Sequence, residues 1–129
     1  MQDWSHLRHH AALDVSLMRA RYVRHAYPRH SHEYYVICLI DEGHQSFTLK
    51  GAKHVTPPGG LIFINPNVTH TGEPADGQGF RMRTIYPTTD LMESAMVEVT
   101  GRRPARVSAH TGLSARTGGW RLPDDGAER

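Results

Sequence analysis

The chain has 129 residues and a formal net charge of +2, with 38% hydrophobic and 22% charged residues. This length fits one domain with its own core, so neither a disulfide nor a metal is needed merely to fold. The charge does not favour a nucleic-acid surface, because nine Lys and Arg stand against ten Asp and Glu up to Gly101, and the six other basic residues fall in the last 28 positions.

Cysteine usage and hydrophobicity bear on the compartment. Cys38 is the single cysteine and lies in an apolar stretch, so it cannot form an internal disulfide and is expected to be a buried, inert thiol. The N-terminus lacks the basic-then-apolar run of a signal peptide, and no apolar run approaches the roughly 20 residues of a membrane span. These features predict a soluble cytoplasmic protein with no membrane partner.

The N-terminal part divides into an arm and a strand. Residues 1–12 contain several histidines and few apolar side chains, and we expect a flexible arm there. Residues 13–23 mix apolar and basic side chains in a pattern that favours a strand. Arg19 and Arg21 would share one face of it, which is either solvated or directed at an anionic ligand.

The next stretch, residues 30–43, is predicted to be one strand that ends at a glycine. Both of its faces are largely apolar, which is typical of a strand inside a layered or barrel structure. Because side chains alternate along a strand, one set should point into the enclosed space. That set comprises His30, His32, Tyr34, Val36, Cys38 and Ile40.

Further short strands are predicted at 45–50, 61–64 and 80–86, separated by Gly and Pro turns roughly every eight to twelve residues. This punctuation indicates an all-β sandwich or barrel. In the last strand Met82 and Thr84 are expected inside. A shift of one residue would instead turn Arg81 and Arg83 inward and favour an anionic ligand.

The pattern changes after Pro87. A short helix is predicted at about 90–99, with Asp90 as its cap and Glu93 closing a capping box. Its apolar stripe should pack on the barrel. The Arg-rich tail, residues 101–129, has few large apolar groups and no usable period, so it is expected to be disordered or poorly packed.

Three motifs follow one another along the chain: the pair His30-x-His32, the turn Pro58-Gly59-Gly60, and a stretch from Pro66 to His70. Together they resemble the two motifs of the cupin superfamily. Within that superfamily, residues 13–98 most resemble the N-terminal ligand-binding and dimerisation domain of AraC-type transcription regulators. The segments from His30 to Tyr35 and from Gly79 to Pro87 also carry this likeness.

The resemblance implies a cupin-type double-stranded β-helix, or jelly-roll, barrel over residues 13–100. Its interior would hold a small effector, such as a sugar or another small organic compound, and the domain would form a homodimer. Complete regulators add a C-terminal helix-turn-helix domain, which residues 102–129 are too short to hold. We therefore expect no direct DNA binding, and the chain is interpreted as a stand-alone sensor, a truncated regulator or one with a frameshifted C-terminus.

The competing cupin interpretation is a small metal-dependent enzyme. Metal-binding cupins usually carry a glutamate four or five residues after the second histidine, where this chain has Val36 and Ile37. Three imidazoles alone can still hold zinc, nickel or iron. We expect no catalysis and no metal, and keep His30, His32 and His70 as the metal ligands of the alternative. The expected ligand-binding residues are His30, His32, Tyr34, His70, Met82 and Thr84.

Overall fold

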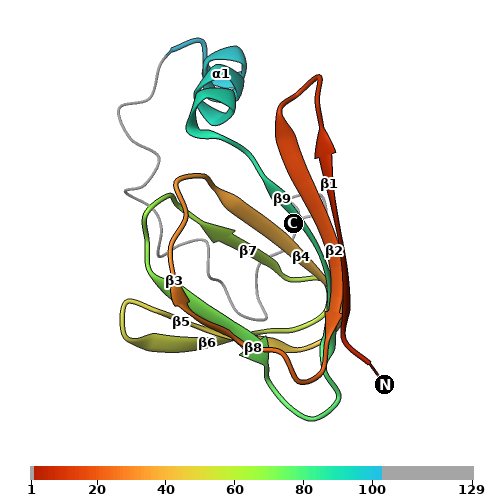
Figure 1. Cartoon of the computed structure of the whole chain (residues 1–129). Coiled ribbons are helices and arrows are strands. Elements are labelled where there is room, and N and C mark those ends of the chain that lie inside the picture. The colour runs from red at the N-terminus through yellow and green to blue at the C-terminus, as the bar shows by residue number, and fades with distance from the viewer. Residues whose placement is uncertain (1, 103–129) are drawn as a thin grey trace.

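A computed structural model describes residues 2–102, which form nine strands and one helix (Figure 1). The strands are β1 (Trp4–His10), β2 (Val15–Tyr22), β3 (Tyr27–His30), β4 (Val36–Gly43), β5 (Gln45–Leu49), β6 (Ala52–Thr56), β7 (Leu61–Ile64), β8 (His70–Pro74) and β9 (Phe80–Tyr86). The helix α1 covers Thr89–Thr100. The predicted all-β architecture with one C-terminal helix is confirmed.

Two antiparallel sheets face each other. One has the order β1-β2-β9-β4-β7 and the other the order β3-β8-β5-β6. Successive strands such as β4 and β5 lie in different sheets, so the chain crosses repeatedly between the layers. This crossing closes the jelly roll and places residues distant in sequence around one interior.

The core forms where the inward faces of the two sheets meet. Alternate residues of β4 are buried, as the period-2 pattern predicted. Phe47 on β5 and Phe80 on β9 are each only 1% exposed. Burying one such side chain contributes about 1.5–3 kcal/mol. The core cluster comprises Ala20, Tyr22, Val36, Cys38, Ile40, Phe47, Leu49, Ile62, Ile64, Phe80 and Met82.

The prediction of one strand from His30 to Gly43 is wrong. Strand β3 ends at His30, and the chain re-enters a strand at Val36 in the other sheet. The backbone between them forms hydrogen bonds outside the strand pairings. The amide of Tyr35, for example, donates to the Pro87 carbonyl at 2.9 Å. The β-branched and aromatic sequence gave no local sign of this corner, which is imposed by the passage between the two layers.

The N-terminal segment is also more ordered than the predicted flexible arm of residues 1–12. Strand β1 pairs with β2 along its whole length, from Trp4 opposite Arg21 to His10 opposite Val15. The Asp3 carboxylate accepts backbone hydrogen bonds from the Val23, Arg24 and His25 amides. Those bonds anchor the start of the strand, although all of its side chains are exposed.

Helix α1 appears close to its predicted position. Its cap is Thr88 and not Asp90, because the Thr88 hydroxyl oxygen accepts a hydrogen bond from the Leu91 amide at 3.1 Å. Gly101 ends the helix with φ of 80°. The expected packing of the helix on the barrel is at most partial: none of its residues is fully buried, Leu91, Met92 and Met96 are half-buried, and the helix stands at one end of the barrel (Figure 1). Residues 103–129 of the predicted tail lie outside the described part of the chain.

The register of β9 settles the direction of its arginines. Met82 and Thr84 are buried, whereas Arg83 is exposed and its guanidinium lies 2.8 Å from the Asp41 carboxylate. Arg81 and Arg21 both pair with Glu42. The predicted inward position of Met82 and Thr84 is therefore confirmed, and the shifted alternative with inward arginines is wrong.

Candidate functional site: a histidine-lined cavity between the sheets

A cavity of about 370 Å³ lies between the two sheets. Its lining comes from β1, β2, β3, β4, β5, β7, β8 and β9, so side chains from both layers converge on it. This is the concave, mostly apolar kind of site that small ligands occupy. All six side chains expected from the sequence line it, namely His30, His32, Tyr34, His70, Met82 and Thr84.

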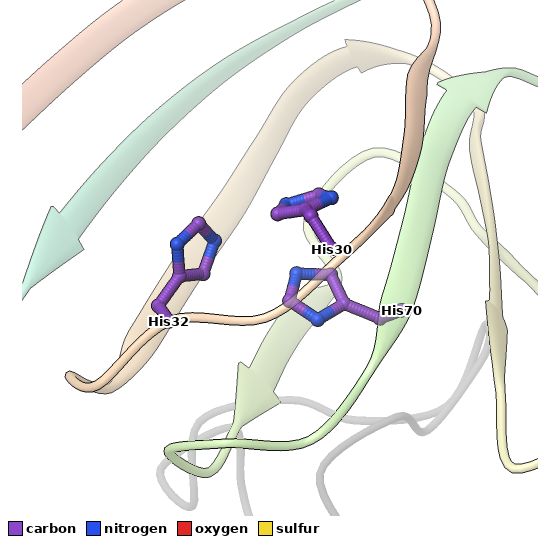
Figure 2. Close-up of side chains that lie close together, drawn as sticks. All are labelled: His30, His32 and His70. Atoms are coloured by element: carbon purple, nitrogen blue, oxygen red, sulfur yellow. The ribbon is translucent and has the colours of Figure 1, made fainter.

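The three histidines reach one point from three segments. His30 ends β3, His70 begins β8 directly opposite it, and His32 lies on the connection that leads to β4. Figure 2 shows the three rings directed toward one another. The ring centroids of His30 and His70 are 4.3 Å apart, and one ring nitrogen from each of the three lies within 4.8 Å of the others.

Backbone carbonyls orient two of these rings. The Nδ1 of His30 lies 2.7 Å from the Pro28 carbonyl oxygen, and the Nδ1 of His70 lies 2.8 Å from that of Val68. A carbonyl only accepts, so each Nδ1 carries the proton and donates it. In the neutral ring, Nε2 is then left as an acceptor or metal ligand.

Burial keeps two of the imidazoles neutral. The pKa of His32 is lowered to about 4, mainly by desolvation and also by the neighbouring His30 and His70. Desolvation also lowers the pKa of His70, against the opposing effect of its bond to the Val68 carbonyl. His32 and His70 therefore offer lone pairs, and not positive charges, near neutral pH.

Tyrosines form the walls beside the histidines. The Tyr34 ring stacks on His32, with centroids 4.7 Å apart and planes 20° from parallel. Tyr86 meets Tyr34 edge-on, and the hydroxyls of Tyr22 and Tyr27 are 2.6 Å apart. Burial raises the pKa of Tyr27 and Tyr86, which keeps these phenols protonated. Of these tyrosines, Tyr27, Tyr34 and Tyr86 line the cavity.

Gln45 is a buried polar residue of the cavity that sequence reasoning missed. Gln45 lines it, is 9% exposed, and its Oε1 has no hydrogen-bond partner within the described residues. Gly72 lies beside it, where a Cβ atom would come within 3.2 Å of the Gln45 Nε2. Its position on the strand could have indicated this, because Gln45 belongs to the same alternating series as the inward residues Phe47 and Leu49. A polar residue in such a series has a reason to face the interior.

The lining carries little charge. No Lys or Arg is among the described residues around the cavity, and its one carboxylate, Asp14, is exposed and pairs with His9 at 3.1 Å. Val36, one of the two positions at which the resemblance to metal-binding cupins would place a glutamate, contributes an apolar side chain to the lining. The Cys38 thiol is fully buried, and burial raises its pKa to about 12, so it is no nucleophile.

The profile of one protein family, described as the AraC-like ligand binding domain, matches residues 12–124, which is most of the chain. The chain belongs to this family. A relative of this AraC-like domain is the uncharacterized HTH-type transcriptional regulator YbfI of Bacillus subtilis strain 168, 34% identical over 89 residues. The match covers 69% of this chain and 32% of that regulator, so the chain spans about a third of its relative's length.

Solved structures place the AraC-like domain in the cupin fold. A cupin superfamily protein from Desulfitobacterium hafniense DCB-2 has a TM-score of 0.60 at 15% identity, covering 67% of this chain and 78% of that one. KdgF from Halomonas sp. gives 0.56 at 18%, covering 70% and 84%. An RmlC-like cupin with a double-stranded β-helix fold from Methanocaldococcus jannaschii gives 0.54 at 18%, covering 57% and 70%. The predicted family and the double-stranded β-helix fold are confirmed.

In the described part of this AraC-like domain, no helix is both long enough and apolar enough to cross a membrane.

Proposed function

We propose that this AraC-like domain senses a small uncharged organic molecule, such as a sugar or a neutral aromatic compound, within the barrel. It acts as the effector-binding and dimerising part of a transcriptional regulator and carries out no chemistry. The observation that carries the proposal is the neutral cavity, with imidazole acceptors from His30, His32 and His70 and the unpaired Gln45 amide oxygen. The reducing cytoplasm suits the buried free thiol of Cys38.

The charge balance supports an uncharged ligand. An ionised group placed in the cavity would lose its hydration and meet no Lys or Arg among the described lining residues. A hydroxyl group can donate to an imidazole Nε2 or to Gln45 Oε1, and it can accept from a tyrosine. Flat faces of a sugar or an aromatic ring would pack against Tyr34 and Tyr86, as they do in most small-molecule sites.

Thr88 links the cavity to helix α1. Thr88 lines the cavity and also caps α1, and Met82 and Thr84 lie on the strand that leads into it. A ligand that contacts these residues in one conformation better than in another would shift the position of α1. Such differential affinity is all that an effector needs to bias an attached domain or a dimer partner.

Matched probes test the ligand class. We would titrate D-glucose, D-xylose, phenol and benzyl alcohol by calorimetry, with D-glucuronate and benzoate as charged counterparts. At least one neutral probe should bind with a Kd of about 1 mM or tighter, and the charged counterparts should bind more weakly. Replacing Gln45 with leucine should weaken binding roughly tenfold, because one buried hydrogen bond is lost.

The substitution Gln78→Leu is the matched control, because Gln78 is exposed on the loop before β9. It should leave the titration unchanged. Binding of the charged probes alone, or of none of the six, would contradict the proposed ligand class.

The same histidines support a second candidate role, the binding of a divalent metal such as zinc, nickel or iron. The residues fit such an ion: three ring nitrogens converge within 4.8 Å, and the Nδ1 bonds of His30 and His70 leave Nε2 available. His30, His32 and His70 would hold the metal, which would act as a Lewis acid on a bound oxygen atom. This role belongs to the competing interpretation, a metal-dependent cupin enzyme.

A zinc titration separates the two roles. If the metal role holds, calorimetry should give one Zn²⁺ per chain, and His32→Ala should weaken the affinity at least about tenfold because one of three ligands is removed. The variant His44→Ala is the control, since His44 is exposed and lies outside the cluster. Absence of zinc binding, or zinc binding that His32→Ala leaves intact, would remove the metal role.

A further inference from the structure

The outer face of the five-stranded sheet carries an apolar groove of about 610 Å³. Two rows of paired residues cross it. One row runs from Leu17 through Ile85 to Ile37, and the other places Leu39 between Arg83 and Leu61. Leu17 and Ile85 are 38% and 37% exposed. A row of apolar side chains on the outside of a barrel is a surface that a partner would cover.

The edge of this groove is basic. Arg8 and Arg19 contribute to it, together with His6 and His10 from the edge strand β1. Neither Arg8 nor Arg19 forms an ion pair within residues 2–102, in contrast to Arg83, which binds Asp41. An occupant of the groove should therefore combine an apolar face with negative charge.

Helix α1 has that combination. Its sequence TDLMESAMVEVT holds three acidic residues and no Lys, Arg or His. Its apolar side chains are only partly covered: Leu91, Met92 and Met96 are half-buried, and Val99 is 84% exposed. Twelve helical residues are about 18 Å long, close to the roughly 15 Å across the four strands of the groove.

We propose that α1 of a second copy of this chain lies in the groove, and that the two copies exchange helices reciprocally about a two-fold axis. Within residues 2–102 both surfaces remain partly exposed, and α1 stands away from the sheet (Figure 1). A symmetric exchange covers both surfaces at once, as a closed isologous dimer requires. The inference rests on the dimerisation proposed above and assigns it an interface.

Charge reversal at Arg19 and Glu98 tests the proposed interface. In the proposed dimer Glu98, near the end of α1, would lie by the basic edge that includes Arg19. Sedimentation equilibrium of the full chain should give a dimer. Arg19→Glu and Glu98→Arg should each weaken it at least about tenfold, because each places like charges together. The double variant should recover an affinity within about threefold of the unmodified chain.

Two further variants and a folding check test whether the groove itself is the contact surface. Arg29→Glu, an exposed change on β3 outside the groove, should leave the dimer unchanged. Leu39→Glu should dissociate it by placing a charge on the groove floor. Circular dichroism melts of every variant should stay close to that of the unmodified chain, which separates lost association from lost folding.

Other occupants give different outcomes. If α1 paired with α1 of the partner, Glu98→Arg would affect the dimer but Arg19→Glu and Leu39→Glu would not. If α1 occupied its own groove, the unmodified chain would be monomeric. Either result would overturn the proposed interface. A monomer that still bound neutral probes in the cavity would leave the sensing role intact, so the two failures are distinguishable.

Discussion

The substitution Gly43→Ala should lower the free energy of unfolding by about 3 kcal/mol or more, since a strained backbone and a steric clash add together. Gly43 has φ of 76°, a conformation that a side chain disfavours. A Cβ atom there would clash with the Gly79 carbonyl oxygen and would come within 2.8 Å of the Phe80 Cα. Both are backbone atoms, so the pairing of β4 with β9 would have to shift.

Gly59→Ala is the matched control for this prediction. Gly59 has φ of 85°, but a Cβ atom there would meet nothing within 4 Å. The substitution should then lower the free energy of unfolding only by the backbone strain, about 1–2 kcal/mol. Urea unfolding of both variants measures the difference, and equal losses at the two positions would contradict the steric account.

Stability should fall as the pH drops from about 6.5 towards about 4. In the unfolded chain a histidine takes up its proton near pH 6.5, whereas folded His32 stays neutral down to about pH 4. The pKa of His70 is lowered in the same direction. The unfolded state therefore binds more protons in this range, and unfolding becomes progressively easier on acidification.

Urea midpoints measured from pH 7.5 to pH 4.5 test this prediction. The variant His32→Gln should flatten the pH dependence, because the unfolded chain then gains one proton fewer. His44→Gln removes an exposed histidine outside the cluster and should leave the slope as it is. A stability that rises on acidification, or a slope unchanged in His32→Gln, would contradict neutral burial of this imidazole.

Alternation and turn chemistry made much of the barrel predictable. The bounds of β7 and β9 agree with the sequence prediction, because each is a short apolar or alternating run flanked by Gly, Pro or Asn. The inward position of Met82 and Thr84 followed from the same alternation. The convergence of His30, His32 and His70 in one cavity could be predicted only from the resemblance to family motifs, because the three histidines lie on different segments of the chain.

What the sequence did not reveal depended on tertiary contacts. The corner between His30 and Val36 is set by the change of sheet and not by any local breaker. Strand β1 is too polar to suggest a strand by itself, and its partner β2 imposes the conformation. The helix cap is Thr88 and not Asp90, because the chain turns helical directly after Thr88 and the Thr88 hydroxyl accepts from the Leu91 amide.

The most direct test of the sensing role is site-resolved NMR of the full chain with the same neutral and charged probes. A neutral probe should shift the ring signals of His30, His32 and His70 together with the methyl signals of Met82 and Thr84. These side chains line one cavity. Shifts confined to the outer groove, or no shift with any probe, would contradict the sensing role.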